Sequence, residues 1–110
     1  MYVLVCYLPE SHLELVKSAL FAAGAGTMGG YDRCSWQTKG MGQFRPSLAS
    51  NPFLGERGEL AQVEEWRLEL VVKEEDAPSV IEALKRSHPY EVPSYHLISV
   101  MTEEASWQRP

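Results

Sequence analysis

Three side chains that can bind ligands lie close together near the end of the sequence, in the segment "HPYEVP". His88, Tyr90 and Glu91 provide an imidazole, a phenol and a carboxylate, and Pro89 and Pro93 lie beside them. A neutral imidazole and an ionised carboxylate both suit a divalent ion, and histidine titrates near neutrality. The segment is therefore the first candidate for a ligand or metal site.

Two protein donors do not complete a metal site, because zinc usually takes about three or four protein ligands. A further donor could come from Cys34, from Glu65 or Glu69, or from another subunit. A Cys34 thiolate would suit zinc or cuprous copper, although a lone cysteine is more often a small buried hydrophobe. The candidate metal ligands are His88, Glu91 and Cys34, and the candidate ligand-binding residues add Tyr90 and Glu69.

Architecture alone can also explain the same segment. Pro89 disfavours the helical conformation for the residue before it, so a helix would end at His88. Tyr90 would then pack, and Glu91 would cap or pair locally. The prolines are primarily architectural on both interpretations, and the sequence leaves open whether the cluster is also a site.

Signs of catalysis are few. Glu65 and Glu69 flank Arg67 on one face of a predicted strand, and acid–base catalysis by such carboxylates would require a cleft that excludes water. The motifs CxxC, HExxH and GxxxxGK[ST] are absent. The glycines of "GAGTMGG" follow a predicted helix, whereas a dinucleotide-binding loop lies between a strand and the helix it opens. They therefore indicate turns.

Composition and charge narrow the range of partners. The chain has 110 residues, 45% of them hydrophobic, and a formal net charge of -5. Its 10 basic residues are scattered, so nucleic acid, which requires clustered Lys and Arg, is not an expected partner. No apolar run approaches the roughly 20 residues of a membrane span, and nothing resembles a signal peptide. With two cysteines and no signal, a reducing cytoplasmic location is expected.

The spacing of apolar residues predicts four strands and a long loop. In residues 63–72 the side chains of Trp66, Leu68 and Leu70 share one face, as in a half-buried strand. Residues 40–58 show no clear period and are rich in Gly, Pro, Asn and Ser, which predicts an irregular loop that is functional, packed as an Ω-loop, or mobile. The predicted strands are residues 2–8, 31–38, 63–72 and 94–100.

Two helices are predicted between these strands. Ser11 and Glu14 have the spacing of a capping box, which would begin the first helix, and Gly24 would end it. Asp76 is expected to cap the second helix, which ends at His88.

The element order strand, helix, strand, strand, helix, strand predicts an α+β, ferredoxin-like βαββαβ sandwich. Its four-stranded antiparallel sheet would carry both helices on one face, with the long loop between strands two and three. Residues 1–101 would form this single domain and 102–110 a polar tail. So small a domain buries only about two-thirds of its unfolded surface, and its uncovered sheet face and edge strands favour a homo-oligomer.

Several motifs resemble, in the same order, the inserted domain of the YqfO-type, Nif-three-like proteins: "GAGTMGGYDRCSW", "GMGQFRP", "NPFLGERGE", "VEEWRLE" and "HPYEVPSYHL". The resemblance covers roughly residues 1–100. "HPYEVP" also resembles, over a shorter stretch, the CutA divalent-cation-tolerance proteins, which are ferredoxin-like trimers, and PII signalling proteins share that architecture. The resemblance implies a CutA/PII-like fold, with a trimer favoured and a dimer as the alternative.

The longer Nif-three-like proteins carry a two-metal, hydrolase-like core in segments that flank the insert. None of His12, His88 and His96 lies in such a segment, so the resemblance does not imply that dinuclear site here. We therefore expect a non-enzymatic, cytoplasmic module that binds a small ligand or a divalent metal ion, with the 40–58 loop folded over a cleft beside "HPYE". The alternatives are a domain that docks on another protein and, less favoured, an accessory subunit of a metal-dependent hydrolase.

Overall fold

A computed structural model of the chain describes residues 1–101, and the tail predicted for residues 102–110 lies outside this range. The element order confirms the predicted βαββαβ fold. Short 3-10 helices, η1 (Glu10–His12) and η2 (Glu74–Asp76), precede the two α-helices. The strands are β1 (Tyr2–Leu8), β2 (Trp36–Phe44), β3 (Ala61–Val72) and β4 (Tyr95–Ser99), and the helices are α1 (Leu13–Ala22) and α2 (Ala77–Ser87).

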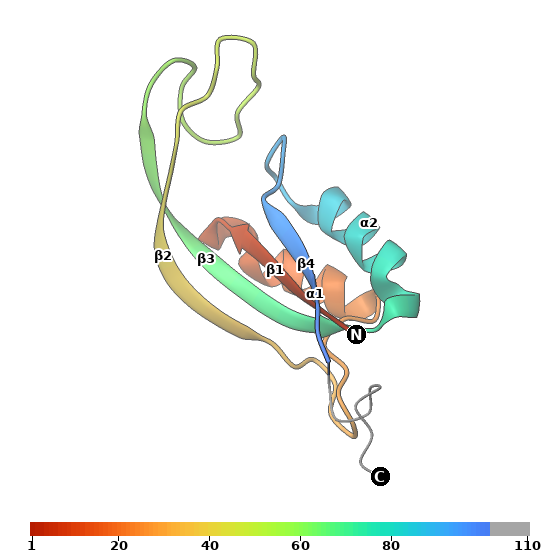
Figure 1. Cartoon of the computed structure of the whole chain (residues 1–110). Coiled ribbons are helices and arrows are strands. Elements are labelled where there is room, and N and C mark those ends of the chain that lie inside the picture. Colours follow the sequence, from red (N-terminus) through yellow and green to blue (C-terminus); the bar gives the residue numbers. More distant parts are fainter. Residues whose placement is uncertain (102–110) are drawn as a thin grey trace.

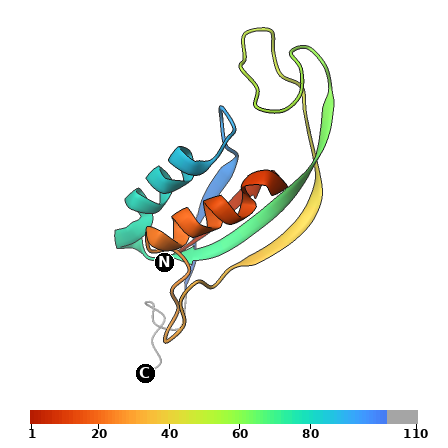
Figure 2. The same ribbon diagram turned by 180° about the vertical axis from the view of Figure 1, so that it is seen from behind.

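The four strands form one antiparallel sheet in the order β2-β3-β1-β4. Both helices cover the same face of the sheet, and the opposite face carries no helix within residues 1–101 (Figures 1 and 2). The β2–β3 hairpin extends past the helices, and the chain between its strands curls at the tip. Neither α-helix is long and apolar enough to cross a membrane.

The hydrophobic core lies between the sheet and the helices. Alternate residues of β1 and β3 enter it, as the sequence pattern predicted, and both helices contribute one apolar stripe. Burial raises the pKa of the Cys6 thiol to about 12, so this group stays protonated and packs as an apolar side chain. The core side chains of lowest exposure are Leu4, Cys6, Leu8, Val16, Leu20, Leu68, Val72, Val80 and Leu84.

The predicted helix caps are wrong in detail. The turn of η1 occupies Glu10–His12 and delays α1 to Leu13, so Ser11 lies before the helix instead of at its cap. The Ser11 hydroxyl instead contacts Nδ1 of His12 at 2.8 Å. Asp76 does precede α2, but its side chain makes no capping hydrogen bond. A local 3-10 turn has replaced the expected cap in both places.

The second strand lies later in the chain than the sequence pattern predicted. It was expected at residues 31–38, whereas β2 pairs with β3 from Trp36 to Phe44 and the irregular segment spans residues 45–60. Gly40 and Gly42 interrupt the alternation of side chains, and they are tolerated because β2 is an edge strand. Cys34 therefore precedes β2 and is not part of it.

The glycine-rich connection between α1 and β2 forms turns, as predicted. Gly26 has a φ of 84°, and its amide donates to the Val71 carbonyl at 2.8 Å. Its own carbonyl accepts the Cys34 amide at 2.8 Å. A Cβ at Gly26 would lie 2.8 Å from the Cys34 carbonyl oxygen, so only glycine fits this crossing without a shift.

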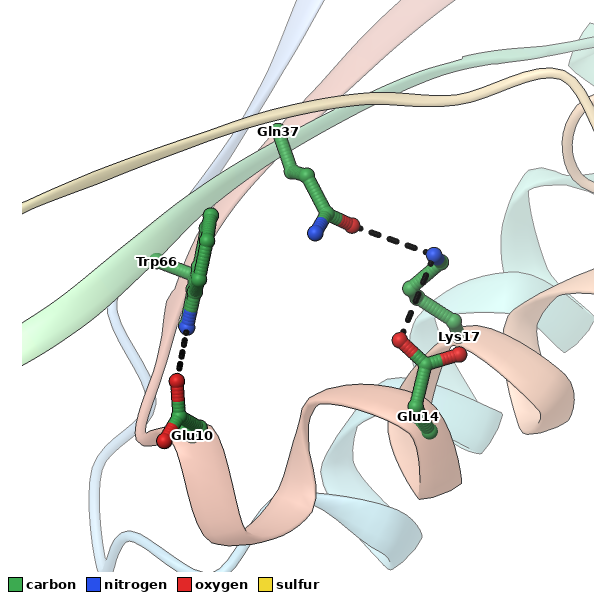
Figure 3. A network of polar contacts seen from close by, with 5 residues as sticks. All are labelled: Glu10, Glu14, Lys17, Gln37 and Trp66. Carbon is green, nitrogen blue, oxygen red and sulfur yellow. Dashed lines mark hydrogen bonds and ion pairs between the residues drawn. The ribbon is translucent and has the colours of Figure 1, made fainter.

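Polar side chains fasten the β2–β3 hairpin to the first helical turns (Figure 3). The Trp66 indole N–H donates to Glu10 at 3.4 Å, and the Lys17 ammonium donates to the Gln37 amide oxygen at 3.1 Å. Lys17 also lies 3.5 Å from the Glu14 carboxylate. Exposed pairs of this kind contribute at most about 1 kcal/mol each, so they orient the hairpin more than they stabilise it.

Candidate functional site

A cleft of about 630 Å³ lies beside the long hairpin. Its walls are the hairpin strands, the 45–60 segment, which we call the hairpin loop, and the 88–94 segment that joins α2 to β4. The hairpin loop curls back from the tip of β2–β3 toward that connection (Figure 1). The lining comprises Tyr7, Thr38, Gly40, Met41, Gly42, Gln43, Phe44, Pro46, Ser50, Pro52, Phe53, Leu54, Glu65, Arg67, Tyr90, Glu91, Val92 and Ser94.

Two glycines on β2 leave room on the floor of the cleft. Gly40 pairs with Glu65 across the ladder, and Gly42 lies two positions further along the same face. A Cβ at Gly42 would overlap the Glu65 carboxylate, whereas a Cβ at Gly40 would meet nothing within 4 Å. The missing side chain at Gly42 therefore lets the Glu65 carboxylate lie over β2.

The Tyr90 phenol joins the 88–94 segment to this floor. Its O–H donates to Oε2 of Glu65 at 2.8 Å. Burial raises the pKa of the Tyr90 phenol well above its usual range, and the hydrogen bond and the negative charge of Glu65 raise it further. The phenol therefore stays protonated near neutral pH and acts as a hydrogen-bond donor to Glu65.

The hairpin loop contacts both the 88–94 segment and η1. The Asn51 amide donates to Oε1 of Glu91 at 3.0 Å. The Phe53 ring packs edge-on against His12, with centroids 5.3 Å apart, and lies 6.4 Å from the Tyr90 ring. The far wall of the cleft is therefore closed by contacts between segments far apart in the sequence.

The His88 imidazole lies behind Tyr90 and is 6% exposed. Its Nδ1 accepts the Tyr90 amide at 3.1 Å, so the ring proton is on Nε2, which donates to the Tyr7 carbonyl at 2.7 Å. Burial lowers the pKa of His88, and the nearby His12 lowers it further, against the opposing effects of the Tyr7 carbonyl and Glu65. Both ring nitrogens are thus engaged within the fold, and the neutral ring braces the cleft wall.

The structure brings together some of the predicted site residues and separates others. Tyr90 and Glu91 line the cleft, and His88 supports it from behind. Glu69 lies on the sheet face shared with Arg67, 3.5 Å from its guanidinium, and is not part of the lining. Cys34 lies at the far end of the sheet.

The predicted metal ligands do not gather within one chain. The Cys34 amide donates to the carbonyl of Gly26, which is itself hydrogen-bonded to Val71, and Val71 pairs with Val3 near the start of β1. The His88 ring, in contrast, donates to the carbonyl of Tyr7 near the end of β1. Val3 and Tyr7 are four residues apart on β1, or about 13 Å. Residues 1–101 contain no group of three or more His, Cys, Asp or Glu side chains placed to hold a metal ion.

Several residues that line the cleft or hold its walls together were not identified from the sequence. Phe44 and Phe53 were visible as isolated apolar residues in a polar stretch, which is the signal that could have placed them in a pocket. Asn51 and Gly42 gave no signal, because their importance depends on contacts with Glu91 and Glu65. Only the folded hairpin brings these positions together.

No protein-family model matches the chain, but several known proteins have a similar sequence. The chain is 42% identical over 103 residues to a "GTP cyclohydrolase 1 type 2 homolog" of Halalkalibacterium halodurans, covering 94% of this chain and 28% of that protein. The Bacillus subtilis protein of the same name is 42% identical over 97 residues, covering 88% of this chain and 26% of the relative. The chain therefore spans about a quarter of the length of these relatives.

Solved structures give the same result for the fold. A Bacillus cereus protein related to NIF3 has a TM-score of 0.78 and 34% identity, covering 92% of this chain and 26% of that chain. The periplasmic divalent cation tolerance protein CutA from Archaeoglobus fulgidus has a TM-score of 0.66 and 14% identity, covering 92% and 84%. The PII-like protein CutA from Nostoc sp. has a TM-score of 0.60 and 20% identity, covering 91% and 81%. The likeness to CutA confirms the predicted fold.

Proposed function

The chain is a homologue of one part, about a quarter, of the NIF3-related proteins and has a CutA-like fold, and from this premise we propose that it is a non-enzymatic module whose cleft binds a small organic molecule. The single observation that carries this proposal is the cleft itself. Its volume of about 630 Å³ lies within the range of roughly 300–1,000 Å³ typical of small-molecule sites. Like such sites, it combines apolar walls with a few polar groups.

The contacts around the cleft support a site that exists before a ligand arrives. Tyr90 is fixed by Glu65 and His88, and Asn51 holds the hairpin loop to Glu91. A wall that is already ordered loses little conformational entropy when a ligand binds, which favours affinity. Since a ligand would contact both walls, binding would stabilise the hairpin loop in the position described here.

Binding is favoured over catalysis by the kinds of side chains in the lining. Among residues 1–101, the lining holds hydroxyl groups and carboxylates but no His, Cys or Lys, so none of these hydroxyls lies beside a neutral base of the usual kind. Glu65 already accepts the Tyr90 phenol, and the raised pKa of that phenol makes it a poor nucleophile. The proposed role is therefore recognition.

A divalent ion is a second candidate ligand, supported by Glu65 and Glu91, which line the same cleft. Such an ion would take oxygen donors, as Mg²⁺ and Ca²⁺ do, instead of the His88 imidazole. The rest of the ion's coordination shell would have to come from water, from backbone carbonyls or from another copy of the chain. The organic ligand has more support because most of the lining is apolar.

The test is a thermal-shift screen of metabolites and divalent ions on the wild type and on two loop variants. Phe53→Ala removes a ring from the cleft wall, and Leu48→Ala alters an exposed side chain of the same loop outside the lining. A ligand at 100 times its Kd should stabilise the wild type by about 2.7 kcal/mol. We expect the shift to survive in Leu48→Ala and to fall at least severalfold in Phe53→Ala. No shift with any compound, or equal shifts in both variants, would contradict the proposal.

A further inference from the structure

We infer that the cleft selects a flat organic ligand whose head group donates hydrogen bonds or carries positive charge, as an amidine or an amino-substituted heterocycle does. This inference rests on the proposed function, because it names the ligand class of the same cleft. It follows from the charges of the lining, from the hydrogen bonds already made there, and from the aromatic walls.

The charged groups of the lining are predominantly acidic. Glu65 lies on the floor and Glu91 on the opposite wall, and Arg67 is the one basic residue that the described part of the chain, residues 1–101, contributes to the lining. The Arg67 Nε lies 3.5 Å from the carboxylate of Glu69, which is outside the cleft. Arg67 is partly exposed and contacts Glu69 through one nitrogen, so its charge offsets only part of the charge of the two carboxylates that line the cleft.

In each carboxylate one oxygen accepts a hydrogen bond, and the second oxygen of Glu65, Oε1, lies over Gly42. Oε2 of Glu65 accepts the Tyr90 phenol, and Oε1 of Glu91 accepts the Asn51 amide. Within residues 1–101, no side-chain or backbone donor forms a hydrogen bond with the second oxygen of either group. A ligand that covered these oxygens without donating to them would remove their water and leave two acceptors unsatisfied, which would weaken binding. Donor atoms on the ligand avoid that loss.

The aromatic side chains define the rest of the ligand. Phe44 and Phe53 belong to the hairpin and its loop, and Tyr7 and Tyr90 approach from β1 and the 88–94 segment. Rings of this kind bind flat molecules, and their faces attract cations when water is excluded. A planar cation or donor-rich ring thus satisfies the walls and the carboxylates at the same time.

An anionic head group on the ligand would be repelled by the acidic side chains of the cleft. A carboxylate or phosphate would lie beside Glu65 and Glu91, and the Arg67 guanidinium is shared with Glu69. Like charges at close range reduce affinity and provide a means of rejecting the wrong ligand. The geometry therefore disfavours free phosphorylated ligands at this site.

Three probes with the same ring separate these possibilities: benzamidine, benzamide and benzoate. Their affinities are measured by titration into 15N-labelled protein at fixed ionic strength, following the amides of lining residues in 40–44, 50–54 and 90–92. We expect benzamidine to bind at least about tenfold more tightly than benzoate, a difference of about 1.4 kcal/mol, with benzamide between them. Glu91→Gln and Glu65→Gln should each reduce the preference for benzamidine at least threefold, roughly 0.65 kcal/mol.

Glu59→Gln is the matched control, because Glu59 is an exposed residue of the hairpin loop outside the lining. It removes the same charge from the chain and should leave the preference unchanged. If Glu59→Gln lowers the preference as much as Glu91→Gln does, the effect comes from net charge and the inference is wrong.

The remaining outcomes distinguish this inference from the proposed function. If benzoate shifts the lining amides and binds as tightly as benzamidine, the ligand class is wrong while a small-molecule site remains. If none of the three probes shifts the lining amides at millimolar concentration, or the shifts occur only elsewhere, the result counts against a small-molecule site and the inference falls with it.

Discussion

The His88 imidazole connects three parts of the chain: it follows α2, accepts the Tyr90 amide and donates to the Tyr7 carbonyl in β1. Removing the ring would leave a carbonyl and an amide without their partner. Each buried polar group left unpaired costs about 1–3 kcal/mol. His88 therefore belongs to the framework of the cleft, and its contribution to ligand binding would be indirect.

Stability should depend on pH through His88. Its pKa in the folded chain is lowered from the usual 6.5 by burial, so near and below pH 6.5 the unfolded chain binds a proton that the folded chain does not. The free energy of unfolding should thus be independent of this group above pH 6.5 and fall as the pH drops below it. Urea unfolding between pH 5 and pH 8 would measure the slope.

Two variants assign that slope. His88→Ala should lower stability at pH 8 and flatten the dependence below pH 6.5, because the titrating group is gone. His96→Ala, at an exposed position on β4, is the matched control: a slope that persists in this variant and is lost in His88→Ala assigns the pH dependence to His88. An unchanged slope in His88→Ala would mean that another group carries the pH dependence.

Gly42 gives a second test at a single position. In Gly42→Ala the Glu65 carboxylate must rotate away from the new Cβ, which breaks its hydrogen bond with Tyr90. We expect a loss of about 1 kcal/mol in the free energy of unfolding, the usual value of one hydrogen bond, together with weaker ligand binding. Gly40→Ala, on the same strand face with free space around its Cβ, should leave the free energy of unfolding nearly unchanged. Equal behaviour of the two variants in denaturant melts would contradict this account.

The connection between α1 and β2 depends on one backbone crossing. Gly26→Ala would place a side chain at a φ of 84° and 2.8 Å from the Cys34 carbonyl oxygen. A non-glycine residue in such a conformation costs about 1–3 kcal/mol before any clash is added, so we expect a loss of at least that size in chemical denaturation. Gly30→Ala, in the same turn but with nothing within 4 Å, is the control and should change stability by much less. Similar losses would mean that the crossing is flexible.

The elements that the sequence predicted well are those that bury one face. The alternation through Leu68 and Leu70 located β3, and the apolar stripe through Val80 and Leu84 located α2, because burial imposes the period of each element. β2 was misplaced because it is an edge strand with glycines at two positions and few buried side chains. The start of α1 was misplaced because a 3-10 turn competes with the capping box for the same residues.

The candidate site was predictable only in part. The segment "HPYE" was identified, and Tyr90 and Glu91 do line the cleft. The opposite wall comes from contacts between residues 25 and 40 positions apart, Tyr90 with Glu65 and Glu91 with Asn51. No local pattern encodes such distant pairs. For the same reason the sequence could not show that both nitrogens of His88 are engaged.

The open face of the sheet and its two edges bear on assembly. The Trp36 side chain is 58% exposed and that of Ile98 is 48% exposed, on a face that no helix covers within residues 1–101. β2 and β4 form the two edges of the sheet, and within residues 1–101 no further strand pairs with them. Both features favour self-association, because edge strands and apolar surface are otherwise liabilities.

We predict a homo-oligomer, with a trimer favoured and a dimer as the alternative. Light scattering at micromolar concentration should give three times the chain mass of 12.4 kDa, or twice that mass for the dimer. Trp36→Glu should lower the measured mass, since it places a charge on the uncovered face. Leu48→Glu, at an 82% exposed position of the hairpin loop, should leave the mass unchanged. A wild-type mass of 12.4 kDa would exclude the prediction.

The Val100 amide donates to the Met1 carbonyl at 3.0 Å, so the chain enters and leaves the fold at nearly the same point. A unit with adjacent ends can be spliced into a surface turn of a host protein, because the host has to separate its own backbone by only one strand spacing, about 4.8 Å. The relatives, about four times longer than the matched region, have the length such a host would need. The unit should therefore be transplantable: joined through short linkers to an exposed turn of an unrelated carrier, it should keep its own fold and leave that of the carrier intact.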